Sequence, residues 1–100
     1  MLPDGFHWAP RCHLDKAPNA VFLGDQIVAY VESKEGGGWF VRLEVQKPFE
    51  APIVTRPARS WDTGRAGIET WVCRHEDRLR REVGVRMAAR PSNRWCARAG

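Results

Sequence analysis

The chain has 100 residues, of which 43% are hydrophobic, including five Trp and four Phe, and it carries a formal net charge of +4. This length and composition suit a single domain with one core, and no apolar run approaches the roughly 20 residues of a membrane-spanning helix. Residues 1–60 carry seven basic and seven acidic side chains and residues 61–83 carry five of each, so the body is neutral and the whole excess lies in four arginines after Val83.

The first predicted elements are an antiparallel pair of strands. Residues 20–23 (AVFL) and 26–33 (QIVAYVES) flank Gly24 and Asp25, a two-residue pair that supplies the positive φ of a tight hairpin. The segment FHW (6–8) is a candidate for a further short strand.

A third strand is predicted at residues 39–46 (WFVRLEVQ), after the glycine-rich turn 35–38. Its period of two separates the side chains of the sheet into two faces. One face is expected to carry Trp39, Val41, Leu43 and Val45 together with Ile27, Ala29 and Val31. The other face is expected to carry Phe40, Arg42, Glu44 and Gln46 together with Val28, Tyr30 and Glu32.

A short apolar piece at residues 53–55 follows Pro48 and Pro52 and ends before Pro57. Proline has no backbone N–H to donate, so a strand bounded by prolines belongs at the edge of a sheet. We therefore expect this piece to form an edge strand.

From Trp61 to Val83 the apolar period becomes helical. The stripe consists of Ile68, Trp71, Val72, His75, Leu79 and Val83. Ser60 and Asp62 are candidate N-caps, and Gly84 is the candidate residue at which the helix ends.

Two glycines within this segment, Gly64 and Gly67, each cost about 1 kcal/mol relative to Ala inside a helix. Two explanations remain open. Either the glycines allow the helix to approach the sheet closely, or the helix begins later, near Arg65.

The stretch RHEDRLRRE (74–82) combines acidic and basic side chains at helical spacing. The pairs four residues apart are Glu76 with Arg80, Asp77 with Arg81, and Arg78 with Glu82. Each pair contributes about 0.2–0.5 kcal/mol on a helix, and the acids would repel a phosphate backbone. The stretch is therefore interpreted as a solvated, self-neutralising helix face.

These elements predict an α+β domain over residues 1–84, with a three- to four-stranded antiparallel sheet packed against one long C-terminal helix. Residues 1–19 are expected to pack on the sheet. Residues 85–100 are predicted to form a basic, flexible tail, in which Pro91 opposes a continuous helix. The tail is either a disordered end that aids solubility or an arm that binds phosphates or an acidic partner, with Trp95 as a stacking surface.

The three cysteines, Cys12, Cys73 and Cys96, are an odd number without regular spacing, and no hydrophobic leader follows Met1. We therefore predict a reduced, cytoplasmic protein. No CxxC or HxxxH pair, phosphate loop or GxSxG motif occurs, and Cys73 and His75 point to different faces of a helix. The sequence thus predicts no catalytic residue, no metal ligand, no cofactor and no enzymatic activity.

Three features follow one another along the chain: a strand with Gly-Trp-x-hydrophobic-Arg, a short strand that ends in Thr, and a helix that carries Trp. The residues concerned are Gly38, Trp39, Val41, Arg42, Ile53, Val54, Thr55 and Trp71. Over roughly residues 26–83 this pattern resembles the arm-type DNA-binding domain of phage integrases. The resemblance implies a three-stranded sheet packed on one helix, with Tyr30, Phe40 and Arg42 on a face that enters the major groove. The excess of arginine over lysine, thirteen to three, also resembles small proteins of phages and prophages.

We expect a non-enzymatic binding module with a protein partner, because Glu32 and Glu44 are predicted on the same sheet face and would oppose phosphates. The expected partner-binding residues are Val28, Tyr30, Phe40 and Arg42. The alternative is a nucleic-acid-binding module that uses Arg42 on the sheet or Arg86, Arg90, Arg94, Trp95 and Arg98 in the tail. It also remains open whether residues 1–19, through Phe6, Trp8 and Leu14, cover this face.

Overall fold

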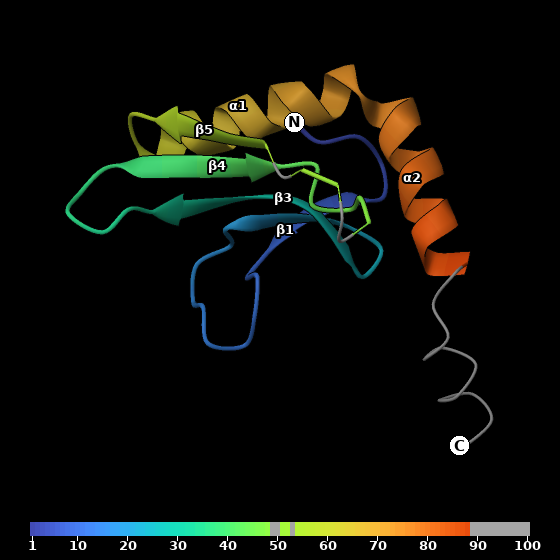
Figure 1. Ribbon diagram of the computed structural model, residues 1–100, viewed down its shortest axis with the longest axis horizontal. Coiled ribbons are helices and arrows are strands. Elements are labelled where there is room, and N and C mark those ends of the chain that lie inside the picture. Colours follow the sequence, from blue (N-terminus) through green and yellow to red (C-terminus); the bar gives the residue numbers. More distant parts are fainter. Residues whose placement is uncertain (49–50, 53, 89–100) are drawn as a thin grey trace.

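The computed structural model describes residues 1–48, 51–52 and 54–88 (Figure 1). Its elements are β1 (Phe6–Ala9), β2 (Ala20–Leu23), β3 (Gln26–Ser33), β4 (Trp39–Leu43), β5 (Val54–Ala58), α1 (Trp61–Arg74) and α2 (Glu76–Ala88). The predicted α+β class and antiparallel sheet are confirmed. The sheet has five strands rather than three to four, because the candidate segments at both edges pair with their neighbours.

The strands form one antiparallel sheet in the order β1-β2-β3-β4-β5, so each strand pairs with the next along the chain. The predicted hairpin is confirmed: Leu23 pairs with Gln26, and Gly24 adopts a φ of 64° in the turn between them. The strand β5 lies at the edge, as predicted. The strand does not end before Pro57, as expected, but runs through it to Ala58, and Pro57 faces Phe40 of β4 in the register.

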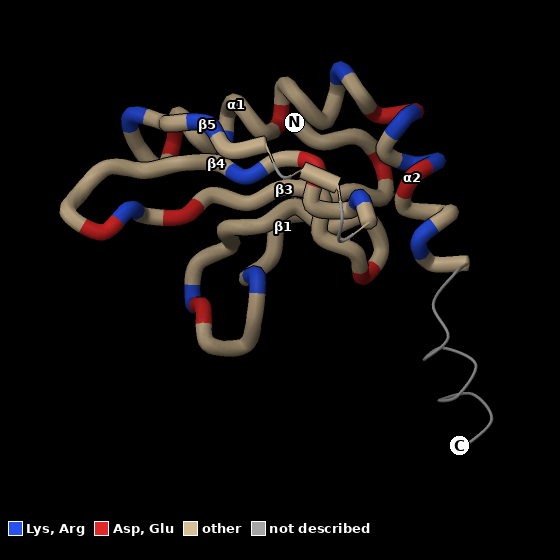
Figure 2. The backbone as a smooth tube through the Cα atoms, in the orientation of Figure 1, with Lys and Arg blue, Asp and Glu red and all other residues tan. Residues whose placement is uncertain are grey.

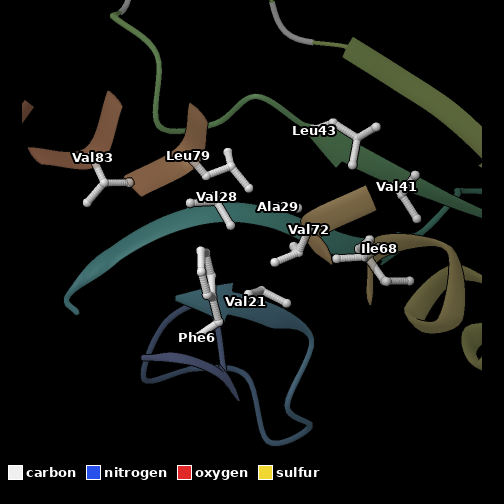
Figure 3. Close-up of a cluster of buried hydrophobic side chains, with 11 residues drawn as sticks. Phe6, Val21, Val28, Ala29, Val41, Leu43, Ile68, Val72, Leu79 and Val83 are labelled. Carbon is white, nitrogen blue, oxygen red and sulfur yellow. The ribbon is translucent and has the colours of Figure 1, made fainter. Parts of the chain in front are cut away.

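A bulge in β3 changes which side chains face the core. Val21 pairs with Ala29 but Phe22 pairs with Ile27, so Val28 is an extra residue without a partner in β2. Val28 is 0% exposed and lies beside Leu79 in the core (Figure 3). The expectation that Val28 shares a face with Tyr30 is therefore wrong, because the bulge interrupts the period of two.

The start of α1 follows from a cap and a close contact. The Oγ of Ser60 accepts a hydrogen bond from the backbone N of Thr63 at 3.1 Å, and the helix begins at Trp61. Gly64 is buried, and a Cβ added there would lie 3.2–3.3 Å from methyl groups of Val31 and Val41. Of the two explanations for the glycines, close approach of the helix to the sheet holds at Gly64.

The expected single long helix is in fact two helices. The chain breaks at His75, with φ −115° and ψ 22°, and its backbone N–H donates to the carbonyl groups of Trp71 and Val72. After the break, α2 turns across the end of the sheet (Figure 1). After this turn, Leu79 and Val83 lie in the same core cluster as Val28.

The second helix also runs further than predicted. It passes through Gly84, which is exposed, and continues to Ala88, the last described residue. Arg86 therefore belongs to α2, and its Nη1 donates to the carbonyl oxygens of Gln46 at 3.2 Å and Lys47 at 2.6 Å. The expectations for Arg90, Arg94, Trp95 and Arg98 lie outside the described residues.

The N-terminal residues pack on the helical side of the molecule. The ammonium of Met1 and the indole Nε1 of Trp8 both bind the carboxylate of Glu69 on α1, at 3.1 and 2.8 Å. Arg80 of α2 donates to the carbonyl oxygen of Asp4 at 2.6 Å. Residues 1–19 thus do not form one covering layer: the first residues contact the helices, and β1 joins the sheet.

Candidate interaction surface on the open sheet face

Both helices lie on one side of the sheet, and we call the other side the open face (Figure 1). Cross-strand pairs place Tyr30 beside Arg42, Glu32 beside Phe40, Phe40 beside Pro57, and Arg42 beside Thr55. Since paired residues in a sheet point to the same side, these side chains form one continuous surface. On β1 and β2 the same surface continues with the stacked rings of His7 and Phe22, whose centroids are 5.5 Å apart.

Part of the open face is covered by the loop between β1 and β2. The guanidinium of Arg11 lies 4.6 Å from the ring centroid of Tyr30, and its Nη2 is 3.2 Å from Oε1 of Glu32. Asn19 holds the loop in place by accepting a hydrogen bond from the backbone N of Arg11 at 2.8 Å. Tyr30 is only 9% exposed as a result. In this covered half of the open face, Tyr30 therefore has little exposed surface with which to contact a partner.

Arg11 remains charged in this position. Burial disfavours its charge, but attraction from Glu32 and Tyr30 outweighs this cost and raises the pKa of Arg11 above its ordinary value. The charge of Glu32 is therefore balanced by the nearby guanidinium of Arg11. Leu14, in the same loop, is 78% exposed and does not pack on the sheet.

The uncovered half contains a shallow depression of about 430 Å³, lined by Lys34, Phe40, Arg42, Thr55 and Pro57. The guanidinium of Arg42 lies 5.5 Å from the ring centroid of Phe40, within cation–π range. The Nε of Arg42 is buried and has no hydrogen-bond partner among the described residues. The depression thus presents an aromatic ring and a proline ring together with two cationic side chains.

Glu44 does not lie on the open face, contrary to expectation. Strand β4 ends at Leu43, and Glu44 adopts a φ of 65°, which turns its carboxylate toward α2. There Arg78 binds both carboxylate oxygens, at 2.8 and 3.0 Å. Gln46 is likewise buried, at 1% exposure, and donates to Glu82 at 2.6 Å. The predicted alternation fails here because the strand is shorter than the apolar pattern.

The carboxylate of Glu44 stays ionised. Burial would raise the pKa of Glu44, but hydrogen bonds from Arg78 and Gln46, together with the charges of Arg78 and Lys47, lower it below the ordinary value. Glu44 is therefore a structural anchor between the end of β4 and α2.

The four predicted partner-binding residues have three different environments. Val28 is in the core, Tyr30 is beneath Arg11, and Phe40 and Arg42 lie together in the depression. The prediction did not include Lys34, Thr55 and Pro57, which complete the depression. The sequence indicates Thr55 and Pro57 only as parts of the proline-bounded edge strand. Which residues of that strand face the same way as Phe40 depends on its register with β4, which the sequence does not show.

The predicted self-neutralising stretch on the helices forms two of its three pairs. Arg80 lies 2.6 Å from Glu76, and Arg78 lies 3.1 Å from Glu82. No ion pair joins Asp77 to Arg81, both of which are exposed.

The side chains that could bind a metal ion or act as nucleophiles do not form a cluster in the described part of the chain. Within residues 1–48, 51–52 and 54–88, no three His, Cys, Asp or Glu side chains are grouped so that they could hold a metal ion. Cys12 and Cys73 are free and exposed. Neither of the helices in these ranges has the length and apolar character required to cross a membrane.

No protein-family model, curated protein or solved structure matches this chain. Its function is therefore inferred from its own surfaces.

Proposed function

We propose that the chain is a non-enzymatic module that binds a protein partner through the uncovered half of the open face, centred on Phe40 and Arg42. The observation that supports this is the depression in which an aromatic ring, a proline ring and the cations Lys34 and Arg42 meet, on the sheet face opposite α1 and α2. Aromatic and arginine side chains are enriched at the energetically important centres of protein interfaces. A depression of this kind accepts one anchoring side chain of a partner.

The distribution of charge favours a protein over a nucleic acid. Basic and acidic residues alternate along the helices and loops (Figure 2). Two other arginines of the domain do not lie beside Arg42: Arg65 packs 4.2 Å from the ring centroid of Trp8, and Arg56 pairs with Val41 on the helix-facing side of the sheet. A phosphate backbone needs several cations along one path, which the described surface does not offer around Phe40.

Nucleic-acid binding through the same face is the second candidate, and one observation favours it. The carboxylate of Glu44 is turned away toward Arg78, and the carboxylate of Glu32 is paired with Arg11. Neither therefore opposes phosphates at the depression. This arrangement is compatible with the resemblance to the arm-type DNA-binding domain.

The experiment uses charge reversal on two faces of the full chain. Arg42→Glu alters the depression, and Arg81→Glu is the matched control, because Arg81 is exposed on α2 away from it. Wild type and both variants are immobilised and incubated with lysate of the source organism, and retained proteins are identified by mass spectrometry. We expect a protein that wild type and Arg81→Glu retain and Arg42→Glu does not.

The second arm of the experiment measures binding of a labelled DNA duplex at two salt concentrations. Binding that weakens steeply with salt and disappears in Arg42→Glu would support the nucleic-acid candidate in place of the protein partner. If Arg42→Glu retains the same proteins and the same duplex as wild type, the open face is not the binding surface.

A further inference from the structure

A second surface lies on the other side of the sheet, between α1 and the edge strand β5. It is a groove of about 660 Å³, which we call the α1–β5 groove. Apolar side chains from the strands and the helix line it: Val41, Leu43, Val54 and Trp71. Polar and charged side chains at its borders include Glu44, Arg56, Arg74, His75 and Arg78. Its volume falls within the range of about 300–1,000 Å³ of ligand sites in proteins.

The groove exists because of the two glycines in α1. Because Gly64 has no side chain, the helix packs closely against Val31 and Val41 in the middle of the sheet. Gly67, which also lines the groove, presents no side chain toward β5, and a Cβ added there would meet no atom within 4 Å. Between Thr63 and Trp71, the residues of α1 that line the groove are these two glycines, so no side chain fills the space there.

The free charge in the groove is positive. Arg56 from β5 and Arg74 from α1 are both exposed, and neither guanidinium group has an ion pair or hydrogen bond among the described residues. Arg78, by contrast, is committed to Glu44 and Glu82. Glu44, the one carboxylate at the border among the described residues, is thus already neutralised, and the two guanidinium groups of Arg56 and Arg74 remain available from opposite walls.

The apolar part of the groove offers an aromatic surface. Trp71 is partly exposed, and its ring lies in a tilted contact with the ring of His75, at a centroid distance of 5.8 Å. Val54 on β5 is also partly exposed. A ligand that matches the groove needs carboxylates for the two arginines and an apolar side chain for Trp71 and Val54, because guanidinium groups bind carboxylates with two parallel hydrogen bonds.

We propose that the α1–β5 groove binds an acidic linear peptide of a partner protein, with acidic side chains at Arg56 and Arg74 and an aliphatic or aromatic side chain against Trp71. Charge complementarity determines this choice of occupant, and the open, elongated border along an edge strand suits an extended chain. The groove lies on the opposite side of the sheet from Phe40 and Arg42. The proposal is therefore independent of binding through the open face.

The test is selection from a displayed library of random octapeptides on the immobilised full chain. We expect enriched peptides that combine Asp or Glu with a large apolar residue. The affinity of a synthetic enriched peptide is then measured by fluorescence anisotropy for wild type and five variants. Gly67→Leu fills the groove and Arg56→Glu reverses its charge; each is expected to weaken binding about tenfold or more.

Each of these variants has a matched control elsewhere on the protein. Gly84→Leu places the same side chain at another exposed helical glycine with no atom within 4 Å of the added Cβ. Arg81→Glu reverses a charge on α2 that has no ion pair with any described residue. Both controls are expected to bind like wild type. Because a Cβ added at Gly67 meets no described atom within 4 Å and leucine favours the helix over glycine, Gly67→Leu is expected to unfold at a temperature no lower than that of wild type.

Several outcomes would overturn the proposal. These are the absence of enrichment, enrichment of neutral or basic peptides, and binding that Gly67→Leu and Arg56→Glu leave unchanged. Loss of peptide binding in Arg42→Glu would assign the peptide to the open face instead. Displacement of the peptide by a DNA duplex, with the same dependence on Arg56, would identify a nucleic acid as the occupant of the groove.

Discussion

Replacing the two glycines of α1 by alanine tests the packing of the helix on the sheet. The Cβ of Gly67→Ala would meet no described atom within 4 Å. The substitution therefore changes stability only through the higher helix propensity of alanine, and the free energy of unfolding should rise by about 0.5–1 kcal/mol. Gly64→Ala gains the same preference but places a methyl group 3.2–3.3 Å from three methyl carbons of Val31 and Val41. Carbon atoms pack favourably at roughly 3.5–4.0 Å, so the helix or the strands must move.

The cost of this movement determines the sign of the Gly64→Ala effect. Val31 and Val41 are buried, at 1% and 8% exposure, and β-branched side chains have few alternative rotamers. Overpacking in such a place costs about 1–3 kcal/mol. Gly64→Ala should therefore be no more stable than wild type and up to about 2 kcal/mol less stable. The two variants should differ by about 1–3 kcal/mol.

Urea denaturation followed by tryptophan fluorescence measures both variants under the same conditions, since the chain contains five Trp. A difference of this size corresponds to several degrees in the unfolding temperature of a domain of this length. If Gly64→Ala is as stable as Gly67→Ala, the helix does not approach the sheet as closely as described, and the explanation of the α1–β5 groove loses its basis.

Three further variants test other parts of the fold. Val28→Ala should lower the free energy of unfolding by about 1–3 kcal/mol in the same denaturation assay, because Val28 is 0% exposed; an effect near zero would contradict the bulge in β3. Ser60→Ala should cost about 1 kcal/mol by removing the N-cap of α1, and unchanged stability would show that the cap is not needed. Glu44→Gln should reduce the acid sensitivity of the protein. The pKa of Glu44 is lowered on folding. The stabilisation that the ionised carboxylate provides is therefore fully present above its ordinary pKa of 4.5, and it is lost as the pH falls through the lower pKa of the folded state. Wild type should therefore lose more stability than Glu44→Gln on acidification from about pH 5 to pH 3, and parallel losses would exclude a role for the pair with Arg78.

Local features of the sequence predicted most of the elements. The Gly24-Asp25 hairpin, the edge position of β5 and the helical period from Trp61 all follow from backbone preferences and side-chain spacing, which act over a few residues. The number of strands was underestimated because β1 and β5 are short, and short edge strands gain their stability from pairing with a neighbour. Pairing partners are not visible in the local pattern.

In the helical region, too, the local pattern is visible in the sequence and the tertiary contacts are not. The stripe that includes Ile68, Val72, Leu79 and Val83 was read correctly, and all four are buried. The break at His75 was not predicted because neither glycine nor proline occurs there. The helix bends so that the second half of the stripe reaches Val28 at the far end of the sheet, and this requirement arises only when the sheet is present.

The sequence by itself determined that this is a small α+β domain with an apolar sheet side and a balanced body charge, because composition and periodicity are properties of the chain. It also brought Phe40 and Arg42 onto one face through simple alternation. Only the tertiary structure decided that Val28 turns inward at a bulge, that Arg11 covers Tyr30, and that Glu44 leaves the face for Arg78. These contacts join residues far apart in the chain, so they depend on register, sheet twist and helix placement, which no short stretch of sequence specifies.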